Sequence, residues 1–288
     1  MRGWFRSPWR WLLTAATACA GCGADDADLV DGGPGQADGA AQGGLSIALD
    51  YRFDDAAFFT PAARTTLAAA AAAWGATFTD DFFEIPAGTS VRTRDPEAPT
   101  ADGMAFDLDV AIDDLLVFVG CSHIDGPSGV TATSNHSAAL GSVVDGALRA
   151  QLQARYQGAD FEPWTAWISF DCDEAWFFDQ TLEDASDIPG DQTDFWSTAM
   201  HELAHTLGFG TADAFAALVD GTPAFTGAHA VAAHGGPVPL TAAGTHFASG
   251  LSSDGREPLM DSSRPGGERF PPTTLDRAAL ADLGYQLR

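Results

Sequence analysis

The sequence predicts an α+β fold in which short strands and a few helices are joined by long loops. The 31 glycines and many short apolar runs among 288 residues favour such a fold over a helix bundle. Apolar residues alternate with small or polar ones over residues 45–53 and again over 165–170, as they do along strands. The apolar run 115–119, which ends at Gly120, is typical of a central strand covered on both sides.

The first helix is expected from Thr60 to about Trp74. Proline at position 61 suits the first helical residue. Leu67 and Trp74, seven residues apart, give this alanine-rich segment a stripe that faces the core. The segment is therefore interpreted as a core helix rather than as low-complexity sequence.

The remaining elements are indicated by weaker patterns. We expect strands over 89–92 and 105–110, a Gly/Ser/Pro/His-rich loop over 121–137, a helix over 143–156 and mainly loops after Gly210. The last helix is expected over 275–283, with Thr274 as its N-cap and Gly284 after its end.

Charge restricts the partners of the protein. With 14 arginines, no lysine and 40 acidic residues, the net charge is -26. Nucleic acid and anionic membrane surfaces would repel such a chain.

The 45% of hydrophobic residues in 288 allows one large domain or two small ones with an ample core. We expect a monomer that acts outside the cell.

Residues 1–22 have the pattern of an export signal. Arginines at the start precede a short apolar stretch over 11–18, which is too short to span a bilayer. The segment 19–23 resembles the lipobox of bacterial lipoproteins, with Cys22 as the lipid-bearing residue, although Cys19 stands where leucine is usual. Plain secretory cleavage nearby is the alternative. The sequence therefore predicts an exported protein, at the cell envelope or secreted, whose only membrane contact is this anchor.

Residues 23–44 consist mainly of Asp, Ala and Gly and are expected to form a flexible tether. The folded domain is then expected over 45–288, with an N-terminal subdomain to about 210 and a C-terminal one from 211. Within it, Cys121 and Cys172 each follow an expected strand, and in an exported protein such cysteines often pair. Two buried free thiols are the main alternative to this disulfide, and a second zinc site of the two cysteines with a histidine is a further one.

The most informative segment is 200–210, which contains the pattern His-Glu-x-x-His-x-x-Gly. Residues four apart lie on one face of a helix, so His201 and His205 can bind one metal ion. Glu202 is placed to accept a proton from water, whose pKa a zinc ion lowers to roughly 7. A buried helix that carries two histidines by chance is the alternative. The Gly208-Phe209 pair that follows favours a zinc hydrolase.

The surrounding residues also favour a helix at this motif. Asp194 suits the N-cap, and Gly208 permits a left-handed turn that ends the helix. An apolar side away from the histidines is formed by Phe195, Ala199, Leu203 and Leu207.

Two downstream segments extend the motif: Gly-Thr-His-Phe at 244–247 and Glu-Pro-Leu-Met at 257–260. Together with the helix they resemble the metzincin clan of zinc endopeptidases, which have a methionine turn after the zinc-binding motif. The usual metzincin has its third ligand three residues after the glycine, where this chain has Thr211. This departure resembles the leishmanolysin-like peptidases and similar bacterial proteins, in which the third histidine follows a long insertion.

The resemblance implies a metzincin-like fold with a mixed twisted sheet, an active-site helix and a loop-rich C-terminal subdomain. It implies that His201, His205 and His246 hold one zinc ion and that water is the fourth ligand. Glu202 would be the general base, and Met260 would form the turn beneath the metal without binding it. The expected activity is cleavage of proteins or peptides by a zinc-dependent endopeptidase.

Several alternatives accompany this hypothesis. His229 and His234 also follow the motif helix and are candidates for the third ligand. A glutamate ligand from a second helix is nearly excluded, because no glutamate lies between Glu202 and Glu257, and Glu257 precedes a proline. A non-catalytic, surface-anchored binding or adhesion protein is the alternative from another class, and the presence of Glu202 disfavours it.

The other histidines and the acidic pairs are expected to be solvated. His123 and His136 fall in the expected loop 121–137. Calcium is a conceivable second ion, but no segment has the spacing of a known calcium loop. The pairs considered are Asp54-Asp55, Asp80-Asp81 and Asp113-Asp114.

Overall fold

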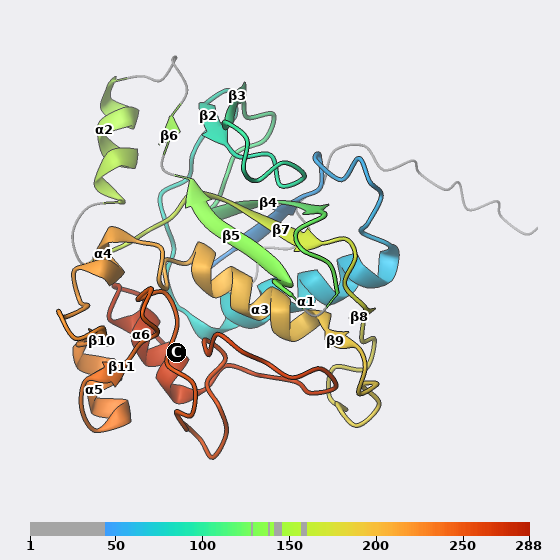
Figure 1. Cartoon of the computed structure of the whole chain (residues 1–288). Coiled ribbons are helices and arrows are strands. Elements are labelled where there is room, and N and C mark those ends of the chain that lie inside the picture. Colours follow the sequence, from blue (N-terminus) through green and yellow to red (C-terminus); the bar gives the residue numbers. More distant parts are fainter. Residues whose placement is uncertain (1–43, 128, 138, 141–145, 157–159) are drawn as a thin grey trace, which may run out of the picture. The chain divides into compact units, whose positions relative to one another are not determined.

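A four-stranded mixed sheet forms the centre of the fold (Figure 1). Its strand order is β1-β4-β7-β5, and the first three strands are parallel, whereas β5 is antiparallel to β7 at one edge. The predicted α+β class is confirmed. The strands are β1 (Ile47–Asp50), β4 (Leu115–Ser122), β7 (Thr165–Asp171) and β5 (Ala132–Ser137).

The computed structural model describes residues 44–288 except 128, 138, 141–145 and 157–159, and these described residues all belong to one compact unit. The expected signal segment with Cys22, and all of the expected tether except Gly44, lie outside the described residues. No helix among the described residues is long and apolar enough to cross a membrane.

Strand β4 is buried on both faces, as its apolar run predicted. Leu115, Val117 and Val119 belong to the main hydrophobic core. Leu116 and Phe118, which point to the opposite face because side chains alternate along a strand, belong to a second core. The central position of β4 between β1 and β7 agrees with this double burial.

Two helices cover the main-core face of the sheet, α1 (Pro61–Thr77) and α3 (Phe195–Thr206). Thr60 caps α1, and both Leu67 and Trp74 are fully buried, so the predicted stripe is confirmed. The indole Nε1 of Trp74 donates a hydrogen bond to the carbonyl oxygen of Met200 at 2.8 Å. Helix α1 is therefore joined directly to the helix that carries His201 and His205.

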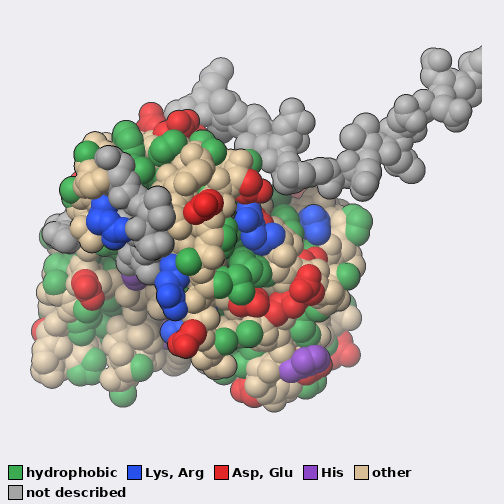
Figure 2. Space-filling model, turned by 90° about the horizontal axis from the view of Figure 1, so that it is seen from above, with side chains coloured by type: hydrophobic (Ala, Val, Ile, Leu, Met, Phe, Trp, Pro, Cys, Tyr) green, Lys and Arg blue, Asp and Glu red, His purple; other side chains and the backbone are tan. Residues whose placement is uncertain are grey.

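The second core lies on the opposite face of the sheet. In a small antiparallel sheet with the order β3-β2-β6, Val91 of β2 and Phe106 of β3 contribute to it, and so does Leu152 of α2. Figure 2 views the molecule from the side on which β2 and β3 lie in Figure 1, and carboxylates and arginines are interspersed there. The elements are β2 (Ser90–Thr93), β3 (Met104–Asp107), β6 (Ala139–Leu140) and α2 (Gly146–Ala154).

Residues 211–288 contain more regular structure than the sequence predicted. Helix α6 is capped by Thr273 rather than by the predicted Thr274, because Thr273 exchanges hydrogen bonds with Asp276 in a capping box. Short elements also interrupt the expected loop region after Gly210. They are α4 (Asp213–Ala216), β10 (Ala224–Phe225), α5 (Ala228–His234) and β11 (Val238–Pro239), whereas α6 (Thr274–Ala281) is the predicted last helix. Two further short strands, β8 (Trp176–Phe177) and β9 (Thr193–Asp194), precede this region.

The expected loop 121–137 was wrong for residues 121 and 122, which belong to β4, and for its last six residues, which form β5. This segment is polar and has no alternating apolar pattern, so no local sign of a strand is visible in the sequence. It forms a strand by pairing with β7. His136 consequently lies on a strand and packs against the rings of Tyr156 and Phe161. Its expected solvation was also wrong, because its Nδ1 is buried without a hydrogen-bond partner among the described residues.

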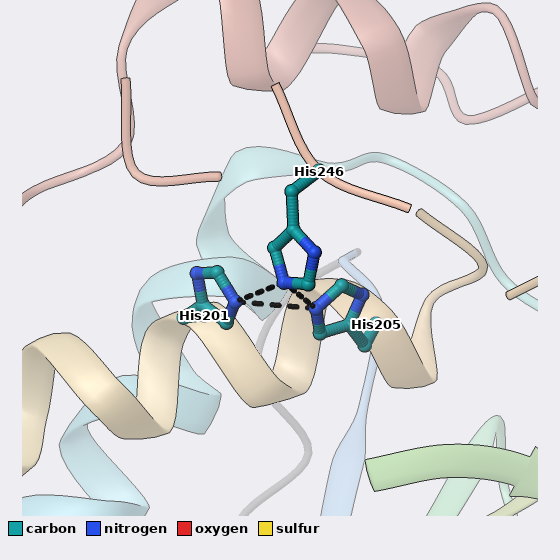
Figure 3. Close-up of side chains that lie close together, drawn as sticks. All are labelled: His201, His205 and His246. Atoms are coloured by element: carbon teal, nitrogen blue, oxygen red, sulfur yellow. Dashed lines mark hydrogen bonds between the residues drawn. The ribbon is translucent and has the colours of Figure 1, made fainter. Parts of the chain in front are cut away.

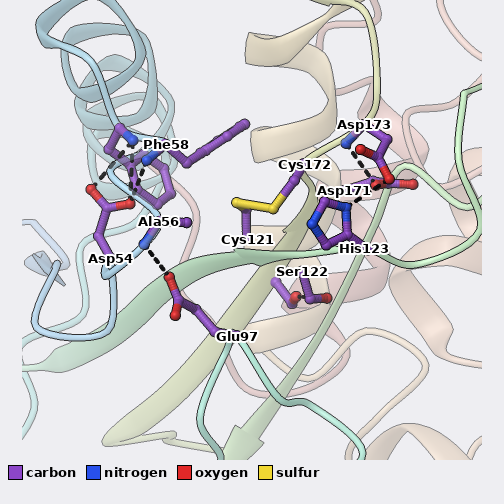
Figure 4. Close-up of a disulfide and its surroundings, with 12 residues drawn as sticks. Asp54, Ala56, Phe58, Glu97, Cys121, Ser122, His123, Asp171, Cys172 and Asp173 are labelled. Atoms are coloured by element: carbon purple, nitrogen blue, oxygen red, sulfur yellow. Dashed lines mark hydrogen bonds and ion pairs between the residues drawn. A yellow bond between two sulfur atoms is a disulfide. The ribbon is translucent and has the colours of Figure 1, made fainter.

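The predicted disulfide between Cys121 and Cys172 is present, with 5.3 Å between the two Cα atoms (Figure 4). Strands β4 and β7 are parallel neighbours, and the two cysteines lie where these strands end. The pairing register therefore brings them within bonding distance. His123 follows nearby and is exposed, as expected, with its Nδ1 2.8 Å from Asp173 Oδ2.

Candidate metal centre

Helix α3 is buried over nearly its whole length and is held firmly at its start. Asp194 is the N-cap, as predicted, and its Oδ2 accepts hydrogen bonds from the backbone N and the Oγ of Ser197. Arg269 donates from Nε and Nη2 to the two oxygens of Asp194 at 3.0 and 2.9 Å. Gly208 follows the helix with φ +103, the left-handed conformation predicted there.

Three imidazoles converge beside this helix (Figure 3). The Nε2 atoms of His201 and His205 lie 3.1 Å apart, and His246 Nε2 lies 3.1 and 3.0 Å from them. Donors at about 2.0–2.1 Å from a tetrahedral zinc ion would lie about 3.3 Å from one another. The observed triangle therefore has nearly the size that one zinc ion requires.

The opposite ring nitrogens determine which tautomer is present. His201 Nδ1 lies 2.9 Å from the carbonyl oxygen of Leu259, and His205 Nδ1 lies 2.7 Å from that of Phe209. A carbonyl can only accept, so both Nδ1 atoms carry the proton and both Nε2 atoms present lone pairs. Lone pairs that face one another at this distance repel, and a cation between them removes the repulsion. The residues thus fit a divalent metal with a preference for imidazole.

Burial keeps these imidazoles neutral. It lowers the pKa of His201 well below its ordinary value, and it lowers the pKa values of His205 and His246 to about 4. Neutral imidazole is the form that binds metal. The group is therefore ready to coordinate a cation at neutral pH.

Glu202 lies next to the first histidine and is buried. Its Oε2 is 2.7 Å from the Oγ of Ser134, on strand β5, and this hydroxyl also lies 3.0 Å from the main-chain oxygen of Glu202. Burial raises the pKa of Glu202 to about 7, while the hydrogen bond from Ser134 opposes this rise. A carboxylate with such a pKa can take up and release a proton near neutrality.

The loop that carries His246 is positioned by its neighbours. Phe247 is fully buried against Phe209, and its backbone N donates to the carbonyl oxygen of Met260 at 2.9 Å. Gly210 permits the close approach on the other side, because a Cβ there would collide with the carbonyl group of Thr245. The turn after α3 and the His246 loop are thereby held against each other.

The segment around Met260 contacts His201 and fixes the orientation of its imidazole. Asp276 of α6 accepts hydrogen bonds from the backbone N of Leu259 and of Met260, both at 2.9 Å. The carbonyl of Leu259 in turn contacts His201 Nδ1. One buried carboxylate at the start of α6 thus orients the imidazole of His201 through the intervening turn.

The other candidate residues lie elsewhere. Thr211 donates from Oγ1 to the carbonyl oxygen of His205 at 2.6 Å, so it closes the end of α3 and does not face the imidazoles. His229 and His234 are exposed on α5 and do not belong to the triad. A second acidic group, Asp81 with Asp113 and Asp114, is mostly exposed, and the buried Asp114 instead accepts backbone hydrogen bonds from Ser46 and Phe82.

Two residues of this centre were missed by sequence reasoning. Ser134 falls in a polar segment whose strand conformation has no local signal. Asp276 had a local sequence signal, because Thr273-x-x-Asp276 before an apolar run is a capping-box pattern. That pattern predicts the helix start, but it does not predict the contact with Met260.

No protein-family model matches this chain, and no curated protein matches it significantly. The chemistry of the site is therefore the basis for the functional proposal.

Proposed function

We propose that this protein is a zinc-dependent endopeptidase. The observation that carries the proposal is the convergence of three neutral imidazole Nε2 atoms next to the buried carboxylate of Glu202. Three protein ligands with one open position are the pattern of catalytic rather than structural zinc. A zinc ion held by His201, His205 and His246 would lower the pKa of water to about 7 and polarise a carbonyl group.

In this proposal Glu202 transfers the protons. Its carboxylate accepts a proton from the attacking water and delivers it to the nitrogen of the departing amine. Ser134 holds Oε2 in one place during both transfers. Burial of the carboxylate excludes bulk water, which would otherwise compete for the proton.

The neighbouring strand supports a peptide as substrate. Among the described residues, β5 is one of the two edge strands of the main sheet, and it packs beside α3. An extended peptide can pair with such an edge through main-chain hydrogen bonds. Ser134 lies on this strand, so a peptide paired there would pass close to Glu202.

We further propose the metzincin branch in which the third histidine follows a long insertion. The buried Met260, next to Leu259 whose carbonyl oxygen contacts His201, and the order Glu202, His246, Met260 in the chain support it. Export, with lipid attachment at Cys22, is also part of the proposal. The disulfide supports export, because disulfides persist mainly in oxidising compartments.

The test measures zinc content and cleavage of casein with and without a chelator. His246→Ala should yield protein with little bound zinc, whereas His229→Ala, an exposed histidine, is the matched control and should stay metallated and active. Glu202→Gln should keep zinc and lose activity. A wild-type protein that binds zinc but cleaves no peptide would instead favour the non-catalytic binding protein. Full activity in Glu202→Gln would refute the proposed mechanism.

A further inference from the structure

An open cavity of about 320 Å³ lies where β5 meets β2. Its lining includes Trp167 of the second core together with Arg92 and Arg94. No acidic side chain of the described residues lines it. In a chain with 40 acidic residues and 14 arginines, a cavity with two arginines and no carboxylate reverses the general charge of the protein. The cavity is therefore a candidate site for an anionic group.

The two arginines reach the cavity from β2. Arg92 lies on this strand and Arg94 directly follows it, and side chains two residues apart in an extended chain point to the same side. Arg94 Nη1 donates a hydrogen bond to the carbonyl oxygen of Pro99 at 2.6 Å, and its guanidinium carbon lies 6.0 Å from the centre of the Trp167 ring. Both arginines are exposed, and neither forms an ion pair within the described part of the chain.

The two carboxylates that follow Arg94 in the sequence are engaged elsewhere. Asp95 Oδ1 accepts a hydrogen bond from the backbone N of Glu97, and Glu97 Oε1 accepts one from the backbone N of Ala56, both at 2.8 Å. The screening length at physiological ionic strength is about 8 Å. The net charge of -26 is spread over the whole chain, so it acts more weakly on a group in the cavity than two adjoining guanidinium groups do.

Direct contacts hold the arginine-bearing segment against β5. Thr93 Oγ1 lies 3.2 Å from Ser137 Oγ, and both residues line the cavity. Strand β6, which follows β5 in the chain, pairs with β2 and places Ala139 opposite Arg92 (Figure 1). The cavity is thus fixed beside the carboxyl end of β5.

Strand β5 also connects the cavity with the candidate metal centre. Ser134 of this strand lies 2.7 Å from Glu202 and pairs with Ile168 of the main core. The next residue, Asn135, lines the cavity and pairs with Trp167 of the second core. Successive side chains of a strand point to opposite faces. The metal centre and the cavity therefore lie on the two faces of one edge strand, a single residue apart along it.

We propose that this cavity binds a carboxylate group of the peptide substrate. The inference rests on the proposed endopeptidase function. A peptide that pairs with β5 shares its pleat, so its side chains alternate between the face of α3 and the face of the cavity. When one peptide residue lies beside Glu202, its neighbour points to the side of the sheet on which Arg92 and Arg94 lie. Guanidinium groups bind carboxylates through paired hydrogen bonds, so an acidic side chain or a free carboxyl terminus is the matching group.

The experiment compares peptides that differ only in this carboxylate. Fluorogenic peptides blocked at both ends carry either glutamate or its neutral isostere glutamine, at each position around the cleaved bond in turn. A further pair has glutamine at all these positions and ends in a free carboxylate or in an amide. All are assayed with zinc-loaded wild type, Arg92→Gln and Arg94→Gln. Arg256→Gln is the matched control, because Arg256 is also exposed and donates to the carbonyl oxygen of a proline.

In at least one pair, wild type should cleave the carboxylate-bearing peptide with a kcat/KM about 10-fold higher or more, as expected of hydrogen bonds to a charged group. This ratio should fall below about threefold in Arg92→Gln and in Arg94→Gln, mainly through KM, and persist in Arg256→Gln. Each ratio compares two substrates on one protein, so a general loss of folded or zinc-loaded protein cancels. The pair that shows the ratio distinguishes an acidic side chain from a free terminus.

Equal kcat/KM within every pair for wild type overturns the inference and leaves the proposed function intact. A ratio that persists in both Arg92→Gln and Arg94→Gln also overturns it. If wild type cleaves no peptide, the proposed function fails, and fluorescence anisotropy then measures binding of the same peptides to zinc-loaded wild type and variants. Tighter binding of a carboxylate-bearing peptide that is lost in the two variants supports the inference, whereas equal affinities overturn it.

Discussion

Replacing Arg269 by glutamine should destabilise the protein strongly, because Arg269 neutralises two buried carboxylates at the start of α3. Its side chain is 8% exposed, and those of Asp179 and Asp194 are each 1% exposed. Nη2 lies 2.5 Å from Asp179 Oδ2 and 2.9 Å from Asp194 Oδ1. Removing one partner of a buried ion pair typically costs about 3–5 kcal/mol. That is a large part of a usual total stability of about 5–15 kcal/mol.

The free energy of unfolding is measured by urea titration at pH 7 on metal-free protein, so that zinc binding does not contribute. Arg277→Gln is the control, since Arg277 is 37% exposed and its contact with Asp254 is 4.0 Å long. Such an exposed pair contributes at most about 1 kcal/mol. A loss in Arg269→Gln no greater than in this control would refute the reasoning.

The pH dependence gives an independent check on the same variant. Burial alone raises the pKa of Asp179, but hydrogen bonds from Thr181 and Arg269 lower it overall below its ordinary value. A depressed native pKa contributes stability that is present above the unfolded value of about 3.9 and is lost as the pH falls through the native value. The difference between wild type and Arg269→Gln should therefore shrink as the pH falls below about 5.

Two further predictions concern β5. Ser134→Ala should retain zinc but lower kcat on a peptide about tenfold or more, because a hydrogen bond to a charged group is worth about 1.5–3 kcal/mol; unchanged kcat would contradict the role of Ser134. Burial lowers the pKa of His136 to about 4, so between pH 6.5 and 4 the unfolded state binds more protons than the native state. The stability of the wild type therefore decreases as the pH is lowered through this range. Replacing His136 by phenylalanine should remove about 2 kcal/mol of the stability difference between pH 7 and pH 5 in urea unfolding, and equal slopes for both proteins would contradict it.

The sequence by itself determined the elements whose signals are local. Pro61 opens α1, Asp194 caps α3, and the Gly208 turn follows α3, as their residue types predicted. The apolar run of β4 predicted its double burial. Each of these features is decided by backbone hydrogen bonds and side chains within a few residues, or by the alternation of side chains along one strand.

Only the tertiary structure decided which distant groups meet. His246 reaches His201 and His205 because the neighbouring Phe247 is buried and its backbone N is hydrogen-bonded to Met260. His229 and His234 lie exposed on α5 and do not reach them. The strand that brings Ser134 to Glu202 forms by pairing with β7, and Asp276 reaches the Met260 turn from another helix. Such contacts depend on how loops close and on which apolar side chains share a core. Neither is written in the few residues around each site, so the helix with two histidines was readable from the sequence, whereas the groups that surround it became visible only in the fold.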